Sequence, residues 1–155
     1  MKISILLPYK ENFTPNKAGA VSLFVNDITN VSAFKKTTFI FGNTNSNKKL
    51  SKNYINLDLK KKVFQSTSKI YVNTFLKYEQ KKPSDLIEVH NRPNYINDIK
   101  KVYRNKLVLY FHNDPLTMNG SKTKNQRLYL LNNIDKIIFN SKWSQKRFFI
   151  GIENE

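Results

Sequence analysis

Short apolar runs recur along the chain and predict the strands of a buried parallel sheet. They lack the regular alternation of polar and apolar residues that a strand exposed on one face would show. The runs are Ile3 to Leu7, Thr38 to Phe41, Leu86 to Val89, Leu107 to Phe111 and Lys136 to Phe139. Strands of this kind are buried on both faces, so we expect helices to cover the sheet on either side.

Apolar residues spaced three and four positions apart predict those helices. The clearest stripe consists of Val21, Phe24, Val25, Ile28 and Val31. Further helices are expected over about residues 67–80, 94–103, 124–131 and 141–149, and the polar segment 42–52 is expected to be a surface loop. Pro83 would end the first of these further helices.

The alternation of strand and helix predicts the fold class. We expect an α/β protein with a doubly wound, mostly parallel Rossmann-like sheet and helices on both faces. The length of 155 residues, without internal repeats or a linker, predicts a single domain over residues 1–155. Ligands of such sheets bind beyond the carboxyl ends of the strands, so the loops that follow the strands are the candidate functional segments.

Composition and charge narrow the chemistry. The chain contains no Cys, which excludes disulfides and thiolate metal sites and favours a cytoplasmic protein. No apolar run is long enough to cross a bilayer or to serve as a secretory signal. The net charge of +16 favours phosphate-bearing partners such as nucleotides, nucleic acid or an anionic membrane surface. Nucleic acid is the less favoured of these, because the Lys pairs are spread along the chain and the aromatic residues follow the apolar stripes.

Both histidines of the chain fall at the carboxyl ends of predicted strands. The two strand ends read Glu88-Val89-His90-Asn91-Arg92-Pro93 and Phe111-His112-Asn113-Asp114-Pro115. His112 with Asp114 could supply a base or a hydrogen-bond donor for a substrate hydroxyl, and Arg92 could hold an anionic group through its planar guanidinium. Two histidines and one carboxylate could also bind a metal, but their spacing matches no compact zinc motif, so we expect no metal site.

Two other loops follow predicted strands. The loop over residues 8–20 reaches its helix through Gly19, where the free amides at the start of a helix could bind phosphate. A plain turn from strand to helix is the alternative, because the G-x-G-x-x-G fingerprint is absent. Ser141 follows the last strand and could contact a ligand at the same edge, although capping its helix is the more ordinary role.

Taken in order, these loops resemble the N-terminal domain of glycosyltransferase family 4, whose members are retaining GT-B enzymes that transfer sugars from nucleotide-sugar donors. The resemblance covers nearly the whole chain. It rests on the segments Lys2 to Pro8, Pro15 to Val21, Glu88 to Pro93, His112 to Pro115 and Ile138 to Ser144. The family often has two adjacent glycines where this chain has Ala18-Gly19.

The resemblance implies roles for individual residues. The catalytic candidates are His112, which would lie beside the reacting sugar, and Asp114. The substrate-binding candidates are Ala18, Gly19, Ala20, His90, Asn91, Arg92, Asn113 and Ser141. The resemblance implies neither a metal nor another cofactor.

The implied function is transfer of a sugar from a nucleotide-sugar donor to a sugar or lipid-linked acceptor in the synthesis of the cell envelope or of a polysaccharide. Family members grip the donor with a second Rossmann-like domain. We therefore expect this chain to be the acceptor-side half of a GT-B enzyme, split or truncated, inactive without a separate C-terminal domain, and in contact with the inner face of the membrane if its acceptor is lipid-linked. Two alternatives stay open: a basic α/β module that binds RNA or another phosphate-bearing partner without catalysis, and a regulatory or structural domain of the flavodoxin type.

Overall fold

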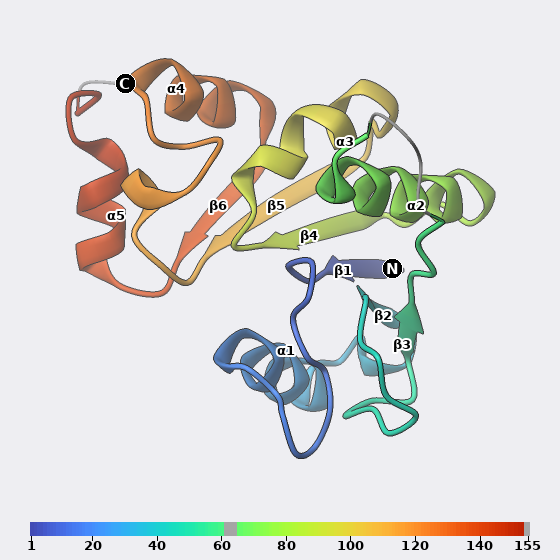
Figure 1. Ribbon diagram of the computed structural model, residues 1–155. Coiled ribbons are helices and arrows are strands. Elements are labelled where there is room, and N and C mark those ends of the chain that lie inside the picture. Colours follow the sequence, from blue (N-terminus) through green and yellow to red (C-terminus); the bar gives the residue numbers. More distant parts are fainter. Residues whose placement is uncertain (61–64, 154–155) are drawn as a thin grey trace.

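A six-stranded parallel sheet forms the centre of the protein. The computed structural model describes residues 1–60 and 65–153. The strands are β1 (Ile3–Leu6), β2 (Thr38–Gly42), β3 (Tyr54–Asn56), β4 (Leu86–His90), β5 (Lys106–Phe111) and β6 (Lys136–Phe139). They lie in the order β3-β2-β1-β4-β5-β6, and every neighbouring pair is parallel. The chain builds outward from β1 to β3, returns to the other side of β1 with β4, and continues to β6 (Figure 1), so the winding reverses between β1 and β4.

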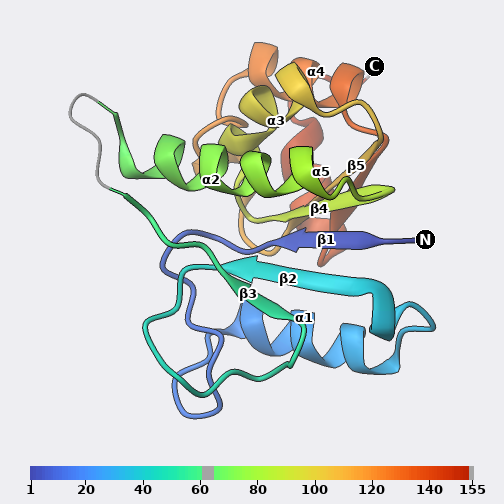
Figure 2. The same cartoon turned by 90° about the vertical axis from the view of Figure 1, so that its right-hand side faces the viewer.

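Helices cover both faces of this sheet. They are α1 (Ala20–Val31), α2 (Thr67–Lys81), α3 (Ile96–Val102), α4 (Lys124–Asn133) and α5 (Lys142–Phe149), with short 3-10 helices η1 (Lys35–Thr37), η2 (Pro93–Tyr95) and η3 (Pro115–Thr117). Figure 2 shows α1 on one side of the sheet and α2, α3 and α4 on the other. This arrangement confirms the doubly wound α/β fold predicted from the sequence. Within the described residues, no helix is long and apolar enough to cross a membrane.

Successive residues of a strand enter two separate cores. Leu6 and Val89 belong to the larger core, which they share with Phe75 of α2, whereas Ile5 packs with Val25 of α1 in a smaller core. All five side chains are at most 2% exposed. Because neighbouring strand positions point to opposite faces, burial on both faces requires apolar residues at consecutive positions. This packing explains why the strands show no regular alternation of polar and apolar residues.

A buried carboxylate ties α2 to the beginnings of β1 and β4. Glu79 is 3% exposed, and its oxygens accept hydrogen bonds from the hydroxyl of Ser4 at 2.6 Å and from the hydroxyl and backbone N–H of Ser84 at 3.1 and 2.9 Å. A buried carboxylate is tolerated where several donors replace its lost hydration. These bonds fix the C-terminal half of α2 at the end of the sheet opposite the strand carboxyl ends.

The structure differs from the sequence prediction in two places. The strand β3 was not predicted, because it has only three residues and its side chains are half-buried or exposed at the edge of the sheet. The helix expected over residues 94–103 begins instead with η2, and the α-helix starts only at Ile96. Pro93 occupies the first position of η2, where its missing N–H costs nothing.

Candidate functional site

Asn91 joins the carboxyl ends of β4 and β5, next to the point where the winding reverses. Its φ of 56° lies in the left-handed region, which Asn tolerates better than most residues. Its backbone N–H donates to the carbonyl of Tyr110 at 2.8 Å, and its side-chain Oδ1 accepts the N–H groups of His112 at 3.1 Å and Asn113 at 3.3 Å. The Oδ1 atom therefore holds the two strand ends together. Through these bonds Asn91 positions His112 and Asn113, which were expected to contact the substrate.

The two histidines lie in direct contact. Nδ1 of His90 is 2.9 Å from Nε2 of His112, and the fully buried His90 places its Nε2 3.5 Å from a carboxylate oxygen of Glu88. Tyr110 stacks on both rings, with centroid distances of 5.3 Å to His90 and 4.7 Å to His112. Phe24 of α1 meets His112 edge-on at 5.1 Å. The structure therefore brings both predicted histidines into one aromatic cluster beneath α1.

The hydrogen bonds from Glu88 through His90 to His112 indicate which ring nitrogens carry protons. A carboxylate only accepts, so Nε2 of His90 donates to Glu88 and Nδ1 of His90 accepts. Nε2 of His112 then donates to His90, which leaves Nδ1 of His112 with a free lone pair. Among the described residues this Nδ1 has no hydrogen-bond partner, and it is not one of the nitrogens sealed from solvent. A substrate hydroxyl could therefore donate to it.

The surroundings of His112 keep its ring neutral. Burial, together with the nearby His90 ring, lowers the pKa of His112 to about 4. At pH 7 the ring is unprotonated, so the lone pair on Nδ1 is available as an acceptor. Such a weak base does not hold a proton firmly at neutral pH, and its use in chemistry is to orient and polarise a hydroxyl.

Asp114 binds α5 tightly. Its carboxylate accepts hydrogen bonds from Nε and Nη2 of Arg147 at 3.2 and 2.9 Å. As the N-cap of η3, Asp114 also accepts the N–H of Leu116 at 3.0 Å. The Arg147 guanidinium holds the pKa of Asp114 below its usual range. These contacts engage both carboxylate oxygens and join η3 to α5. The catalytic role expected for Asp114 stays a prediction, and the geometry gives the residue a positioning role as well.

An internal carboxylate occupies the start of α1. Gly19 is the N-cap and has no side chain to offer, but Oε1 of Glu11 accepts the N–H of Ser22 at 3.3 Å. A Cβ atom on Gly19 would overlap this carboxylate, so the glycine makes room for Glu11. The predicted contact of Ala18, Gly19 and Ala20 with donor phosphates stays a prediction, and a phosphate at these amides would have to displace Glu11.

The loop after β6 adds a link to the histidines. The hydroxyl oxygen of Ser141 accepts the N–H of Ser144 at 3.1 Å, so Ser141 caps α5. Its expected contact with a ligand stays a prediction. The side chain of Asn140 donates to the carbonyl of His112 at 2.7 Å. This bond joins the ends of β5 and β6.

A polar cleft lies beside these strand ends. It measures about 480 Å³ and is lined by the predicted residues Asn91, Arg92 and Asn113 together with side chains from η3 and the loop after it. Arg92 is half-buried, and its Nη1 donates to the carbonyl of Asn91 at 2.7 Å. The volume falls within the range of roughly 300–1,000 Å³ that ligand sites occupy. The cleft therefore joins three predicted residues in one cavity that a ligand can enter.

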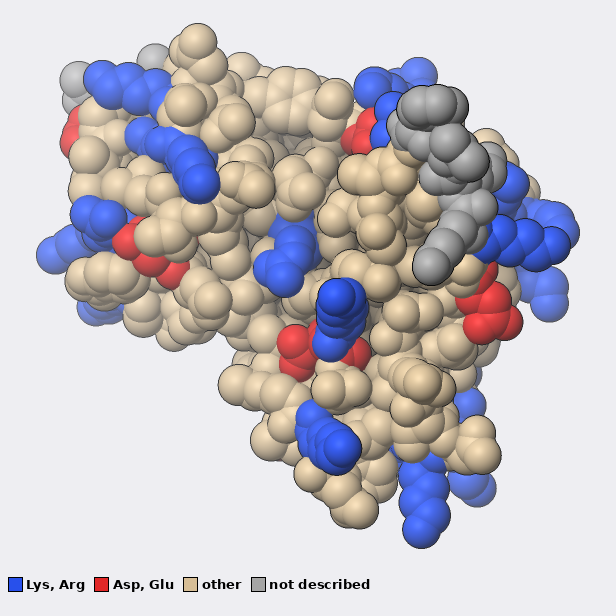
Figure 3. Space-filling view, in the orientation of Figure 1, with Lys and Arg blue, Asp and Glu red and all other residues tan. Residues whose placement is uncertain are grey.

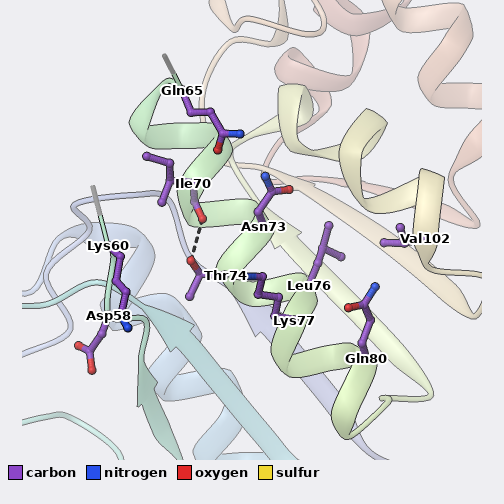
Figure 4. A pocket seen from close by; sticks show the side chains of 10 residues that line it. All are labelled: Asp58, Lys60, Gln65, Ile70, Asn73, Thr74, Leu76, Lys77, Gln80 and Val102. Atoms are coloured by element: carbon purple, nitrogen blue, oxygen red, sulfur yellow. Dashed lines mark hydrogen bonds between the residues drawn. The ribbon is translucent and has the colours of Figure 1, made fainter. Parts of the chain in front are cut away.

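A second hollow runs along α2 and includes none of the predicted site residues. It measures about 480 Å³ and mixes one acidic with two basic side chains (Figure 4). Its lining residues are Asp58, Lys60, Gln65, Ile70, Asn73, Thr74, Leu76, Lys77, Gln80 and Val102. Thr74 is turned back onto its own helix, where its hydroxyl donates to the carbonyl of Ile70 at 2.8 Å. The hollow has no cluster of groups suited to catalysis.

Basic side chains are spread over the surface. Figure 3 shows Lys and Arg in several separate places on this face, divided by uncharged surface, with acidic side chains beside some of them. Within residues 1–60 and 65–153, no three His, Asp or Glu side chains gather closely enough to hold a metal ion.

The sheet order, the helices on both faces and the loops at the reversal point define a Rossmann-like α/β domain. In structure the chain is similar to the sucrose-phosphate synthase from Thermosynechococcus elongatus, with a TM-score of 0.65 and 14% sequence identity. The similarity covers 98% of this chain and 45% of that protein, so the chain spans less than half the length of the protein it matches. No protein-family model and no curated protein matches the chain. At this identity the similarity establishes the fold.

Sequence reasoning missed the residues that support the histidines. Glu88 and His90 lie two positions apart on one strand, as Tyr110 and His112 do at the end of the next strand, and residues with this spacing share a face of the sheet. Applying this rule at the two strand ends would have placed Glu88 on the same face as His90, and Tyr110 on the same face as His112. No comparable signal existed for Arg147, whose partner Asp114 is 33 residues away.

Proposed function

We propose that this chain is the acceptor-side domain of a retaining glycosyltransferase, which moves a sugar from a nucleotide-sugar donor to a sugar or lipid-linked acceptor. The observation that carries the proposal is the neutral His112, whose free Nδ1 lies at the carboxyl end of β5. Two findings support it: the fold is similar to that of sucrose-phosphate synthase, a GT-B glycosyltransferase, and the strand-end segments resemble glycosyltransferase family 4.

In the proposed reaction this domain binds and orients the acceptor. Nδ1 of His112 accepts a hydrogen bond from a sugar hydroxyl at the end of β5, while Arg92 and Asn113 in the neighbouring polar cleft, which His112 does not line, hold another part of the acceptor. Retaining transfer requires the acceptor hydroxyl to approach on the face of the sugar from which the phosphate leaves. Positioning and electrostatic stabilisation therefore contribute more than a strong base would, which agrees with the low pKa of His112.

We further propose that a second α/β domain supplies the donor site and that this chain does not transfer sugar alone. The similarity to 45% of a glycosyltransferase supports this division of labour. The Glu11 carboxylate already lies at the start of α1 and accepts the N–H of Ser22, which supports placing the firm phosphate contacts on the other domain. The completed enzyme would act in the cytoplasm, at the inner face of the membrane when its acceptor is lipid-linked.

Reconstitution tests the proposal. The chain is mixed with a separately produced donor-binding α/β domain, taken from the neighbouring coding sequence if that sequence encodes one. Nucleotide release from UDP-, GDP- and ADP-sugars is then measured with and without cell-envelope glycolipid extract. We expect acceptor-dependent release only when both parts are present. His112→Ala should lower the rate about 100-fold, the lower end of what a positioned acid or base contributes. Lys36→Gln, in η1 at the amino end of β2 and away from the strand carboxyl ends, is the control and should leave the rate unchanged.

Two results would count against the proposal. Full transfer by a correctly folded His112→Ala variant would remove His112 from the reaction. Tight, strongly salt-dependent binding of mixed RNA oligonucleotides, in the absence of any transfer, would favour the alternative of a basic RNA-binding module.

A further inference from the structure

The polar cleft beside the strand ends combines two cations with side-chain amides and contains no acid. Arg92 and Lys122 supply the charge, and Asn94, Asn113 and Asn119 supply amides. We propose that this cleft binds a saccharide that carries an anionic group, a phosphate or a carboxylate, with Arg92 as the principal contact and Lys122 as the second. This inference rests on the proposed function and names the chemical class of its acceptor.

Arg92 is held ready for an anion. Its Nη1 donates to the carbonyl of Asn91, and Asn91 is itself fixed by its bonds to β5, so the guanidinium sits on a rigid support. Within residues 1–60 and 65–153, no carboxylate lies within 4.0 Å of Arg92 or Lys122. A half-buried guanidinium without a counter-ion gains more from an anionic ligand than an exposed one, because less water screens the pair.

The remaining lining suits a sugar. Side-chain amides both donate and accept hydrogen bonds, as a ring of hydroxyls requires, and Ser68 from α2 adds a hydroxyl of its own. The hollow along α2 offers a contrast, because there Asp58 lies among the cations and would repel an anion. Charge and hydrogen-bonding groups therefore favour an anionic saccharide in the cleft at the strand ends.

General attraction to a protein of net charge +16 must be separated from a specific site. Basic side chains occur in several separate places on the face shown in Figure 3, and any of them attracts anions weakly. The proposed site differs because the cation and the amides are arranged around one cavity. Specific binding in this cleft should therefore require both the sugar and the anionic group of the ligand, whereas general attraction requires the anionic group alone.

Binding is measured on the full chain by NMR titration at constant ionic strength, with glucose 6-phosphate, glucuronate, glucose and inorganic phosphate as probes. We expect at least one of the two charged sugars to bind at least fivefold more tightly than both glucose and inorganic phosphate, with shifts centred on Asn94, Asn113 and Asn119. Arg92→Gln should weaken this binding at least fivefold and Lys122→Gln two- to threefold. The control Lys36→Gln makes the same change of charge in η1, at the amino end of β2, and should have no effect.

The outcomes separate this inference from the proposed function. Equal binding of glucose and the charged sugars would overturn the anionic requirement, and equal binding of inorganic phosphate would overturn the saccharide. An equal loss of affinity in Lys36→Gln would reduce the effect to overall charge. If Arg92→Gln does not fold, Lys122→Gln and the site of the shifts decide the question. Because this assay needs neither donor nor second domain, a failure to transfer sugar leaves its result intact.

Discussion

The pH dependence of stability offers a direct test of the histidine pair. The pKa of His112 is lowered from 6.5 to about 4 in the folded protein, chiefly by burial. The unfolded chain therefore takes up more protons than the folded protein between these two values, and stability falls as the pH is lowered through this range. The contribution is fully present above pH 6.5. Linkage over this shift gives a loss of about 2 kcal/mol between pH 7.5 and pH 5. Since His112 is partly open to solvent, screening reduces the expected loss to about 1 kcal/mol.

The assay is urea unfolding followed by far-UV circular dichroism at pH 7.5 and pH 5, for the wild type and for His112→Phe. The Phe ring preserves the stacking against Tyr110 and the edge contact with Phe24, but it cannot take up a proton. We expect the wild type to lose about 1 kcal/mol more than the variant between the two pH values. An equal loss in both proteins would refute the reasoning, because His112 would then titrate alike in the folded and unfolded states.

Three further predictions concern stability, each measured by urea unfolding at pH 7.5. Asn91→Ala should lower the free energy of unfolding by about 2–3 kcal/mol, because two hydrogen bonds are lost and Ala is strained in the left-handed backbone region. Asn91→Gly should lower it by about 1 kcal/mol less, and equal losses would show that the backbone conformation contributes nothing. Glu79→Ala should lower the free energy of unfolding by about 2–4 kcal/mol, because it removes the carboxylate that accepts the buried hydrogen bonds of Ser4 and Ser84. A loss below about 1 kcal/mol would show that the two serines satisfy each other. Gly19→Ala should lower the free energy of unfolding by about 1 kcal/mol because its methyl group displaces Glu11, and the double variant with Glu11→Ala should be little less stable. If the losses of the two single variants simply add in the double variant, the contact between Gly19 and Glu11 is contradicted.

Much of the fold follows from the chain itself, because burial on both faces leaves a strong mark in the sequence. Strands β1, β2, β4, β5 and β6 lie close to their expected limits, since each is a run of apolar residues between polar turns. Strand β3 leaves no such mark, because an edge strand of three half-exposed residues needs neither an apolar run nor an alternating one. Its place is decided by pairing with β2, which is a contact between distant residues.

The candidate site was predictable in its location and less so in its contacts. The rule that ligands bind beyond the carboxyl ends of the strands directed attention to His90, Arg92 and His112. The sequence could not show that the two histidines bond to each other, that Arg147 binds Asp114, or that Glu11 fills the space beside Gly19. Each of these contacts depends on the tertiary arrangement of separate loops, which local sequence patterns do not predict.

Beyond the end of β5, the two sets of candidate residues face different helices. His112 packs against Phe24 of α1, whereas its neighbour Asn113 lines the cleft that also touches Ser68 of α2, and α1 and α2 cover different faces (Figure 2). Substitutions at cleft residues other than Asn91, which is bonded to the backbone of His112, can therefore accumulate without disturbing the histidine pair. Under the proposed function, a lineage carrying this domain is free to exchange one acceptor for another while the histidine pair stays as it is.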